Sequence, residues 1–237
     1  MTITIAPPKS IGAFLRAEPE RFYGWVVCRQ GWLVGFCVAA IVVGAGSYGA
    51  ATGSWRNGVQ ALYTGIKLPL VILLTTLANG LLNGMLAPLL GLNITFRQSF
   101  AVVLMSFAMT AMVLGALSPV AWFIVWNTPP LTGETKISAP EYALLQLTLT
   151  AFVALAGVMG NVRLVPLLRQ WAGRTVVARN VLLAWLAANL FLGSQISWVL
   201  RPFIWDANRP VEFIGADCFG GSFFETIFKA ACRIIIS

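Results

Sequence analysis

The residues of this sequence that could do chemistry are neutral amides set inside apolar runs. Residues 68–92 carry no charged side chain, yet they hold a doubled pair, Asn79-Gly80 and Asn83-Gly84. A spacing of four places the two amides on one helix face and the two glycines beside them. Such a face favours contact with a neighbouring helix, where an amide bond contributes about 1 kcal/mol. The alternative is a polar lining for a substrate or lipid path.

A second set of neutral polar side chains occupies the last apolar run. Asn189 and Gln195 stand there with two serines between and after them. Helix packing is again the favoured interpretation, and a polar strip shared with Asn79 and Asn83 is the alternative.

The sequence offers little for catalysis. It contains no histidine, and its four cysteines form no C-x-x-C pair. Histidine is the usual general base and transition-metal ligand. The apolar runs carry no Asp, Glu, Lys or Arg in their interiors, and phosphate-loop, dinucleotide and zinc-protease motifs are absent. We therefore predict that the protein is not an enzyme and has no metal site and no cofactor.

The composition is that of a membrane protein. The chain is 58% hydrophobic and 10% charged, with a mean hydropathy of +0.81. Soluble domains are about a quarter charged. Although the net charge is +8, the basic residues are scattered at the ends of apolar runs. This pattern suits lipid headgroups and excludes a nucleic-acid partner.

Five apolar runs are long enough to cross a bilayer core of about 30 Å as helices. The predicted spans are Trp32–Ala51, Leu68–Leu92, Phe100–Trp126, Tyr142–Val162 and Val181–Leu200. The predicted fold class is therefore all-α, a bundle of five transmembrane helices with N- and C-terminal interfacial helices. The chain divides into an N-terminal segment, 1–31, the bundle, 32–200, and a C-terminal tail, 201–237.

The loops give the predicted orientation. The connection from Arg163 to Arg179 holds four arginines and no acid, whereas residues 127–141 hold one lysine and two glutamates. Because basic loops stay in the cytoplasm, we expect a multi-pass inner-membrane protein with its N-terminus inside and its C-terminus outside.

Arginines and a tryptophan in that basic connection are candidates for contact with anionic headgroups. They are Arg163, Arg169, Trp171, Arg174 and Arg179. Asn161, just before them, is expected to cap the fourth span.

Two flanking segments have the pattern of interfacial helices. Ser10–Trp25 mixes apolar and charged residues. In the tail, charged residues at i, i+4 and i+8 oppose an apolar face formed by Phe224, Ile227, Phe228 and Ile234. Such a helix would lie on the membrane, dock on a partner, or pack on its own bundle. A disulfide between Cys218 and Cys232 is an alternative to two free thiols, if the tail faces an oxidising compartment.

Three stretches of the sequence resemble an uncharacterised family of bacterial multi-pass membrane proteins. They are residues 62–69 (LYTGIKLP), 79–84 (NGLLNG) and 189–195 (NLFLGSQ), followed by 200–203 (LRPF). More remotely, five spans with Gly65 and Pro69 at the start of the second are similar to Yip1-domain proteins, which act in membrane trafficking. The resemblance implies a fold and no activity.

The leading functional hypothesis is an accessory or scaffold subunit that associates with membrane lipids and with other integral membrane proteins or its own copies. Its basis is the glycine-rich faces, the amphipathic tail and the apolar spans. The alternative is a small transporter, channel or lipid-handling protein that uses the polar strip of Asn79, Asn83, Asn189 and Gln195.

Overall fold

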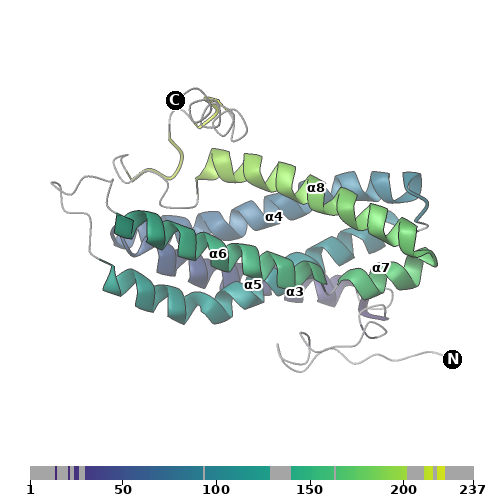
Figure 1. Cartoon of the computed structure of the whole chain (residues 1–237), viewed down its shortest axis with the longest axis horizontal. Helices are drawn as coiled ribbons and strands as arrows, with labels where there is room; N and C mark the ends of the chain where they lie inside the picture. The colour runs from purple at the N-terminus through teal and green to yellow at the C-terminus, as the bar shows by residue number, and fades with distance from the viewer. Residues whose placement is uncertain are drawn as a thin grey trace.

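The computed structural model describes residues 14, 21, 24–26, 30–92, 94–128, 140–162, 164–201, 211–215 and 218–221. Six helices account for most of them, and no strand occurs among the residues described (Figure 1). The helices are α3 (Gln30–Gly53), α4 (Gly58–Leu89), α5 (Phe96–Asn127), α6 (Pro140–Val162), α7 (Leu164–Ala172) and α8 (Thr175–Leu200). All except α7 are long and apolar enough to span a membrane. The predicted all-α fold with five such helices is confirmed.

Local capping makes α4 and α5 longer than the apolar runs alone suggested. Asn57 precedes α4 in an extended conformation, and its side chain accepts a hydrogen bond from the Gln60 N–H at 2.7 Å. Thr95 and Gln98 form a reciprocal capping box at the start of α5. Each helix therefore has 32 residues, a length of about 48 Å that exceeds the hydrocarbon core.

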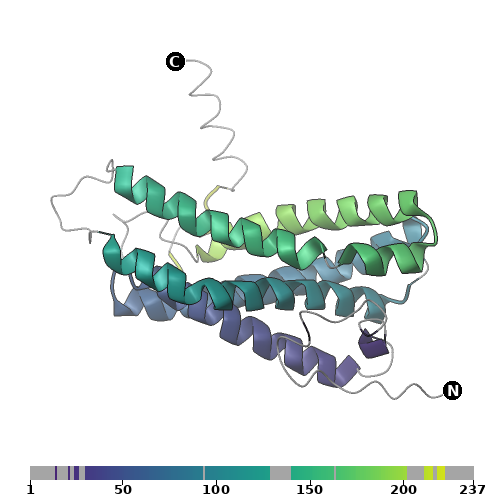
Figure 2. The ribbon, with the colours of Figure 1, turned by 60° about the horizontal axis from the view of Figure 1, so that its bottom comes forward.

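The helices form two layers, α3–α5 below and α6–α8 above (Figure 2). Helix α3 packs against α4 and α5, while α6 lies on α5 and α8 lies on α4. In the most apolar stretch of α5, 67% of residues are buried, against 22% in α6 and 17% in α8. The centre of the bundle is thus α5, and α6 and α8 turn most of their surface outward.

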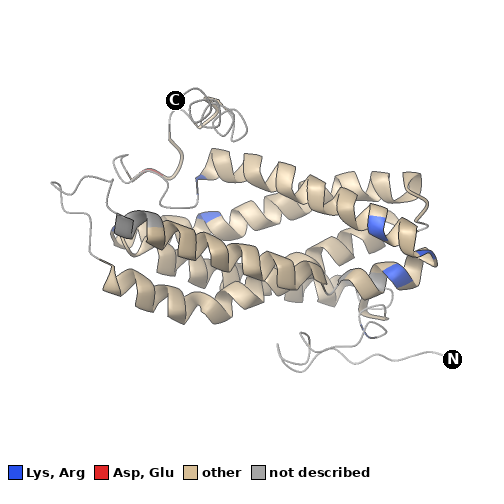
Figure 3. Ribbon diagram, viewed as in Figure 1, with Lys and Arg blue, Asp and Glu red and all other residues tan. Residues whose placement is uncertain are grey.

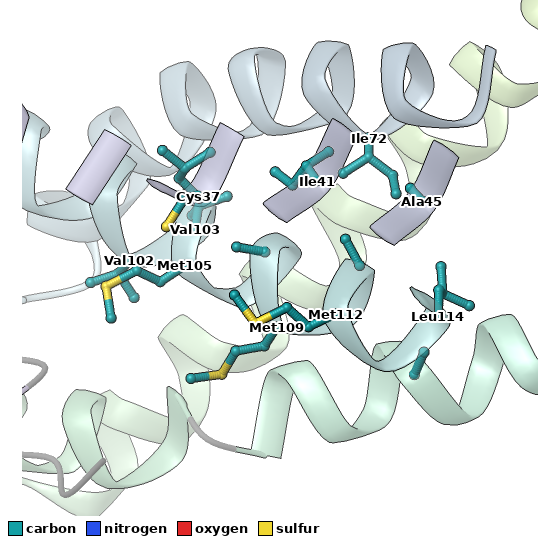
Figure 4. Packing of buried hydrophobic residues seen from close by; sticks show 14 of the residues in the cluster. Cys37, Ile41, Ala45, Ile72, Val102, Val103, Met105, Met109, Met112 and Leu114 are labelled. Atoms are coloured by element: carbon teal, nitrogen blue, oxygen red, sulfur yellow. The ribbon is translucent and has the colours of Figure 1, made fainter. Parts of the chain in front are cut away.

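Small residues allow the lower layer to pack backbone to backbone. A Cβ placed on Gly44 of α3 would meet the Ala111 carbonyl of α5, and one on Gly49 would meet the Thr64 carbonyl of α4. Around these contacts, buried apolar side chains of α3 and α5 pack together, with Cys37 and Ile41 on the side of α3 that faces α5 (Figure 4). Dispersion contacts at this density, together with the close backbones, hold the helices together in lipid.

Positive charge gathers at the two ends of the bundle (Figure 3). One end holds Arg169 of α7 with Arg174 and Arg179 at the start of α8. The opposite end holds Lys67 of α4 and Arg201, which follows α8. The middle of the bundle, in the residues described, contains no charged side chain.

Candidate functional site

Helix α4 carries a line of buried polar side chains along its inward face. The line consists of Gln60, Thr64, Lys67, Thr75, Thr76, Asn79 and Asn83. Steps of mostly three or four residues keep them near one face of the helix. Polar groups in a membrane interior must find partners inside the protein, which makes this line the most informative feature of the bundle.

The doubled Asn-Gly motif turns inward. Asn83 Nδ2 donates a hydrogen bond to Asn79 Oδ1 at 3.1 Å, and both residues are 0% exposed. A Cβ on Gly80 would meet the ring of Phe100, and one on Gly84 would meet the ring of Phe96. The absence of side chains at Gly80 and Gly84 therefore allows α5 to pack closely against α4. The face of α4 that carries the doubled Asn-Gly motif is internal to the protein.

The contact between α4 and α8 fixes which residues lie opposite each other. A Cβ on Gly193 would be 3.6 Å from Thr75 Cγ2. Helices α4 and α8 run antiparallel (Figure 1). Counting along both helices from the Gly193–Thr75 contact puts Asn189 about level with Asn79 and Trp185 about level with Asn83.

Several buried polar atoms at these levels have no hydrogen-bond partner among the described residues. They are Asn79 Nδ2, Asn83 Oδ1, Ser99 Oγ, Trp185 Nε1 and Asn189 Oδ1. Ser99 belongs to this level because it lies between Phe96 and Phe100, which pack on Gly84 and Gly80. We call Asn79, Asn83, Ser99, Trp185 and Asn189 the amide cluster.

The amide cluster combines donors and acceptors without a charge. Asn79 Nδ2 and Trp185 Nε1 donate, whereas Asn83 Oδ1 and Asn189 Oδ1 accept. Leaving a buried polar group unpaired costs about 1–3 kcal/mol. Ordered water or a small uncharged polar ligand is the kind of partner that could satisfy such groups.

Two other predicted polar residues lie elsewhere. Gln195 is two positions from Gly193, about 200° around α8, and so faces away from the Thr75 contact.

Asn161 does not cap α6 as expected. Its Nδ2 donates to the Gly157 carbonyl at 2.8 Å, and its Oδ1 accepts a hydrogen bond from Ser106 Oγ at 3.4 Å. The Asn161 amide thus ties α6 to α5.

Lys67 overturns the expectation that the spans contain no ionisable residue. The predicted second span begins at Leu68, which puts Lys67 in the connection before it. In the structure the helix begins earlier and continues through Pro69, so that Lys67 lies within α4, 4% exposed. The spacing of Gln60, Thr64 and Lys67 at i, i+4 and i+7 is the signal that could have revealed this polar face.

The arginines predicted to contact lipid headgroups lie on or next to a short helix, α7, where the sequence predicted a loop. Arg169 is exposed on α7, and Arg174 and Arg179 are exposed at the start of α8. On α7, Leu168 is buried and Trp171 packs partly against the core. Helix α7 is thus amphipathic, as an interfacial helix requires. Arg163 lies outside the described residues.

Several predictions fall on parts of the chain that the structure does not describe. The tail face of Phe224, Ile227, Phe228 and Ile234 lies there, as does Cys232. Cys218 is a buried free thiol. Within the described ranges, no group of three histidine, cysteine or acidic side chains could hold a metal ion.

Comparison with known proteins gives no relative from which a function can be transferred. No protein-family model, no curated protein and no solved structure matches this chain. The resemblance to a bacterial family and, remotely, to Yip1-domain proteins therefore stays a prediction. The chain is an integral membrane protein with five apolar helices, and its own geometry is the basis for assigning it a function.

Proposed function

We propose that this membrane protein binds and conducts a small uncharged polar solute along the inward face of α4, without catalysing a reaction. The observation that carries the proposal is the amide cluster, whose buried donors and acceptors on α4, α5 and α8 have no hydrogen-bond partner among the described residues. Lipid tails and apolar side chains cannot satisfy such atoms.

The chemistry of the cluster favours a neutral solute over an ion. An ion in a membrane interior requires an opposite charge or a shell of oriented dipoles, because its desolvation costs several kcal/mol. The cluster offers amides, a hydroxyl and an indole, all uncharged. Water, urea and glycerol are solutes that present both donors and acceptors to such a set.

The proposal keeps the predicted orientation in the inner membrane. The end that carries Arg169, Arg174 and Arg179 would then face the cytoplasm, in line with the positive-inside rule. Trp171 and these arginines would contact anionic headgroups there.

Solute flux into proteoliposomes tests the proposal. We expect vesicles with the wild-type protein to equilibrate at least one of water, urea or glycerol faster than empty vesicles in stopped-flow light scattering. Replacing Asn79 and Asn83 by leucine should slow this flux about tenfold or more, because two hydrogen bonds of about 1 kcal/mol each are lost.

Asn161→Leu is the matched control, since it also removes an intramembrane amide, but one whose hydrogen bonds are made within the protein. It should lower thermal stability and leave the flux per folded protein unchanged. Flux equal to that of empty vesicles for all three solutes, or equal flux in wild type and the Asn79→Leu, Asn83→Leu variant, would contradict the proposal.

A second candidate function is the scaffold role, and the outer face of α6 favours it. Leu144, Leu147 and Val158 are each more than 60% exposed, and a Cβ on Gly157 would meet no atom within 4 Å. Another membrane protein, or a second copy of this chain, could pack there as readily as lipid does. Cross-linking from α6 in native membranes should then capture one defined partner. A chain that stays uncross-linked and monomeric in mild detergent would exclude the role.

A further inference from the structure

One threonine of α4 differs from most other threonines of the spanning helices. In a helix, a threonine hydroxyl commonly donates to a main-chain carbonyl three or four residues earlier. This bond is made, at 2.7–3.1 Å, by Thr52, Thr76, Thr110, Thr148 and Thr150. The side chain of Thr75 is 3% exposed, yet its Oγ1 has no hydrogen-bond partner among the described residues. The Thr75 hydroxyl is therefore buried without being bonded to its own helix.

The Thr75 side chain faces a place where α8 has no side chain. Helices α4 and α8 lie side by side (Figure 1). A Cβ on Gly193 would be 3.6 Å from Thr75 Cγ2 and 3.9 Å from Thr75 Oγ1, and no other described residue outside α8 comes within 4 Å of that position. The missing side chain of Gly193 thus leaves room for at least a methyl group beside the hydroxyl. We call this place the Thr75–Gly193 site.

A buried hydroxyl beside such a space requires a polar partner. A hydroxyl donates one hydrogen bond and accepts up to two, and leaving it unpaired in a membrane interior is unfavourable. A valine has the same shape as threonine and would fill the position without that penalty. The threonine therefore indicates a partner that the described chain does not supply, namely water or a small neutral solute with donors and acceptors.

The Thr75–Gly193 site lies one helical turn from the amide cluster. Thr75 precedes Asn79 by four residues on α4, and Gly193 follows Asn189 by four residues on α8. Because the two helices are antiparallel, both steps lead about 6 Å in the same direction, toward the end of the bundle that carries Lys67. A solute that leaves Asn79 and Asn189 in this direction meets the Thr75 hydroxyl next.

We infer that Thr75 and Gly193 form a second binding site for the solute and determine the largest solute that passes. The inference rests on the proposed function and deepens it, because it names the residues that set specificity. Thr75 supplies a hydrogen bond, and the absence of a side chain at Gly193 supplies the space for the bound solute. Since that space is small, a side chain at position 193 should exclude glycerol before urea, and urea before water.

Flux of water, urea and glycerol into proteoliposomes tests the role of Gly193. Gly193→Ala places a methyl group at ordinary contact distance from Thr75, so the variant should fold with a Tm near that of the wild type. It should slow the largest solute that the wild type conducts about tenfold, the effect of crowding a close-packed site by one methyl group. Smaller solutes should be slowed less. Gly157→Ala, which adds a methyl group in open space on α6, should change no flux.

The role of the hydroxyl is tested by Thr75→Val, which keeps the shape of the side chain. Loss of one hydrogen bond to the solute should slow flux about fivefold, whereas Thr75→Ser keeps the hydroxyl and should conduct nearly as well as the wild type. Thr52→Val on α3 is the matched control. Thr52 is also buried, at 2% exposed, but its hydroxyl donates to the Gly49 carbonyl. Its flux per folded protein should equal that of the wild type.

Wild-type flux separates failure of the inference from failure of the proposed function. If the wild type conducts none of the three solutes, the proposed function fails and the inference fails with it. If Asn79→Leu with Asn83→Leu slows flux but Gly193→Ala does not, the inference alone is overturned. Equal slowing by Gly193→Ala of every solute, where the wild type conducts more than one, also overturns it. So does a Thr75→Val variant that conducts as well as Thr52→Val, because the hydroxyl would then bind no solute.

Discussion

Replacing Gly44 by leucine should destabilise the bundle severely. A Cβ at this position would lie 2.7 Å from the carbonyl carbon of Ala111 and closer still to its oxygen. These atoms belong to the backbone of α5 and cannot turn aside as a side chain can. Overpacking in a close-packed core costs about 1–3 kcal/mol, and more where backbone must move. Thermal unfolding in mild detergent should show a large fall in Tm, or no folded protein.

The same helix provides the matched control. Gly35 is exposed, and a Cβ there would meet no atom within 4 Å. Gly35→Leu should therefore leave Tm within a few degrees of the wild type, because most surface changes alter stability by about 0.5 kcal/mol or less. Equal Tm values for the two variants would show that α3 and α5 do not meet backbone to backbone.

Replacing Gly160 by leucine should separate α6 from α5. A Cβ on Gly160 would meet Thr110 Oγ1 and would lie 2.8 Å from the Ser106 carbonyl oxygen, so a larger side chain must push the helices apart. The hydrogen bond from Ser106 to Asn161 would be lost at the same time. Since α6 has its main contact with α5, we expect a fall in Tm and faster proteolysis of the 129–139 connection.

Gly157→Leu is the companion change, three residues earlier on α6, where a Cβ would meet open space. It should not alter Tm or proteolysis of the purified protein. If the two variants behave alike in both measurements, α6 does not pack on α5 through Gly160.

The apolar runs predict the number of helices well, because a span of about 20 apolar residues is a strong signal. They predict the ends of helices less well. Helix α4 begins at Gly58 because Asn57 caps it, and a cap formed by a single side chain does not change the hydropathy pattern. Hydropathy also does not predict helix α7, for a related reason. With nine residues and Arg169 on its surface, it resembles a loop to any hydropathy window.

The candidate site was predictable only in part. The spacing of Asn79 and Asn83 indicated a shared face, and their hydrogen bond follows from that spacing. The sequence around Asn79 and Asn83 does not show which helix packs against this face of α4. It depends on the fit of Gly193 against Thr75, which sets Asn189 level with Asn79. Contacts between distant helices of this kind cannot be read from the period of one helix.

The decisive experiment for the polar solute path is an experimental density map of the protein in lipid nanodiscs, at a resolution that shows ordered water. We predict non-protein density within hydrogen-bond distance of Asn79 Nδ2 and Asn189 Oδ1, between α4, α5 and α8. An interior in which these two amides bond directly to each other, with no density beside Asn83 or Trp185, would contradict the proposal of a polar solute path.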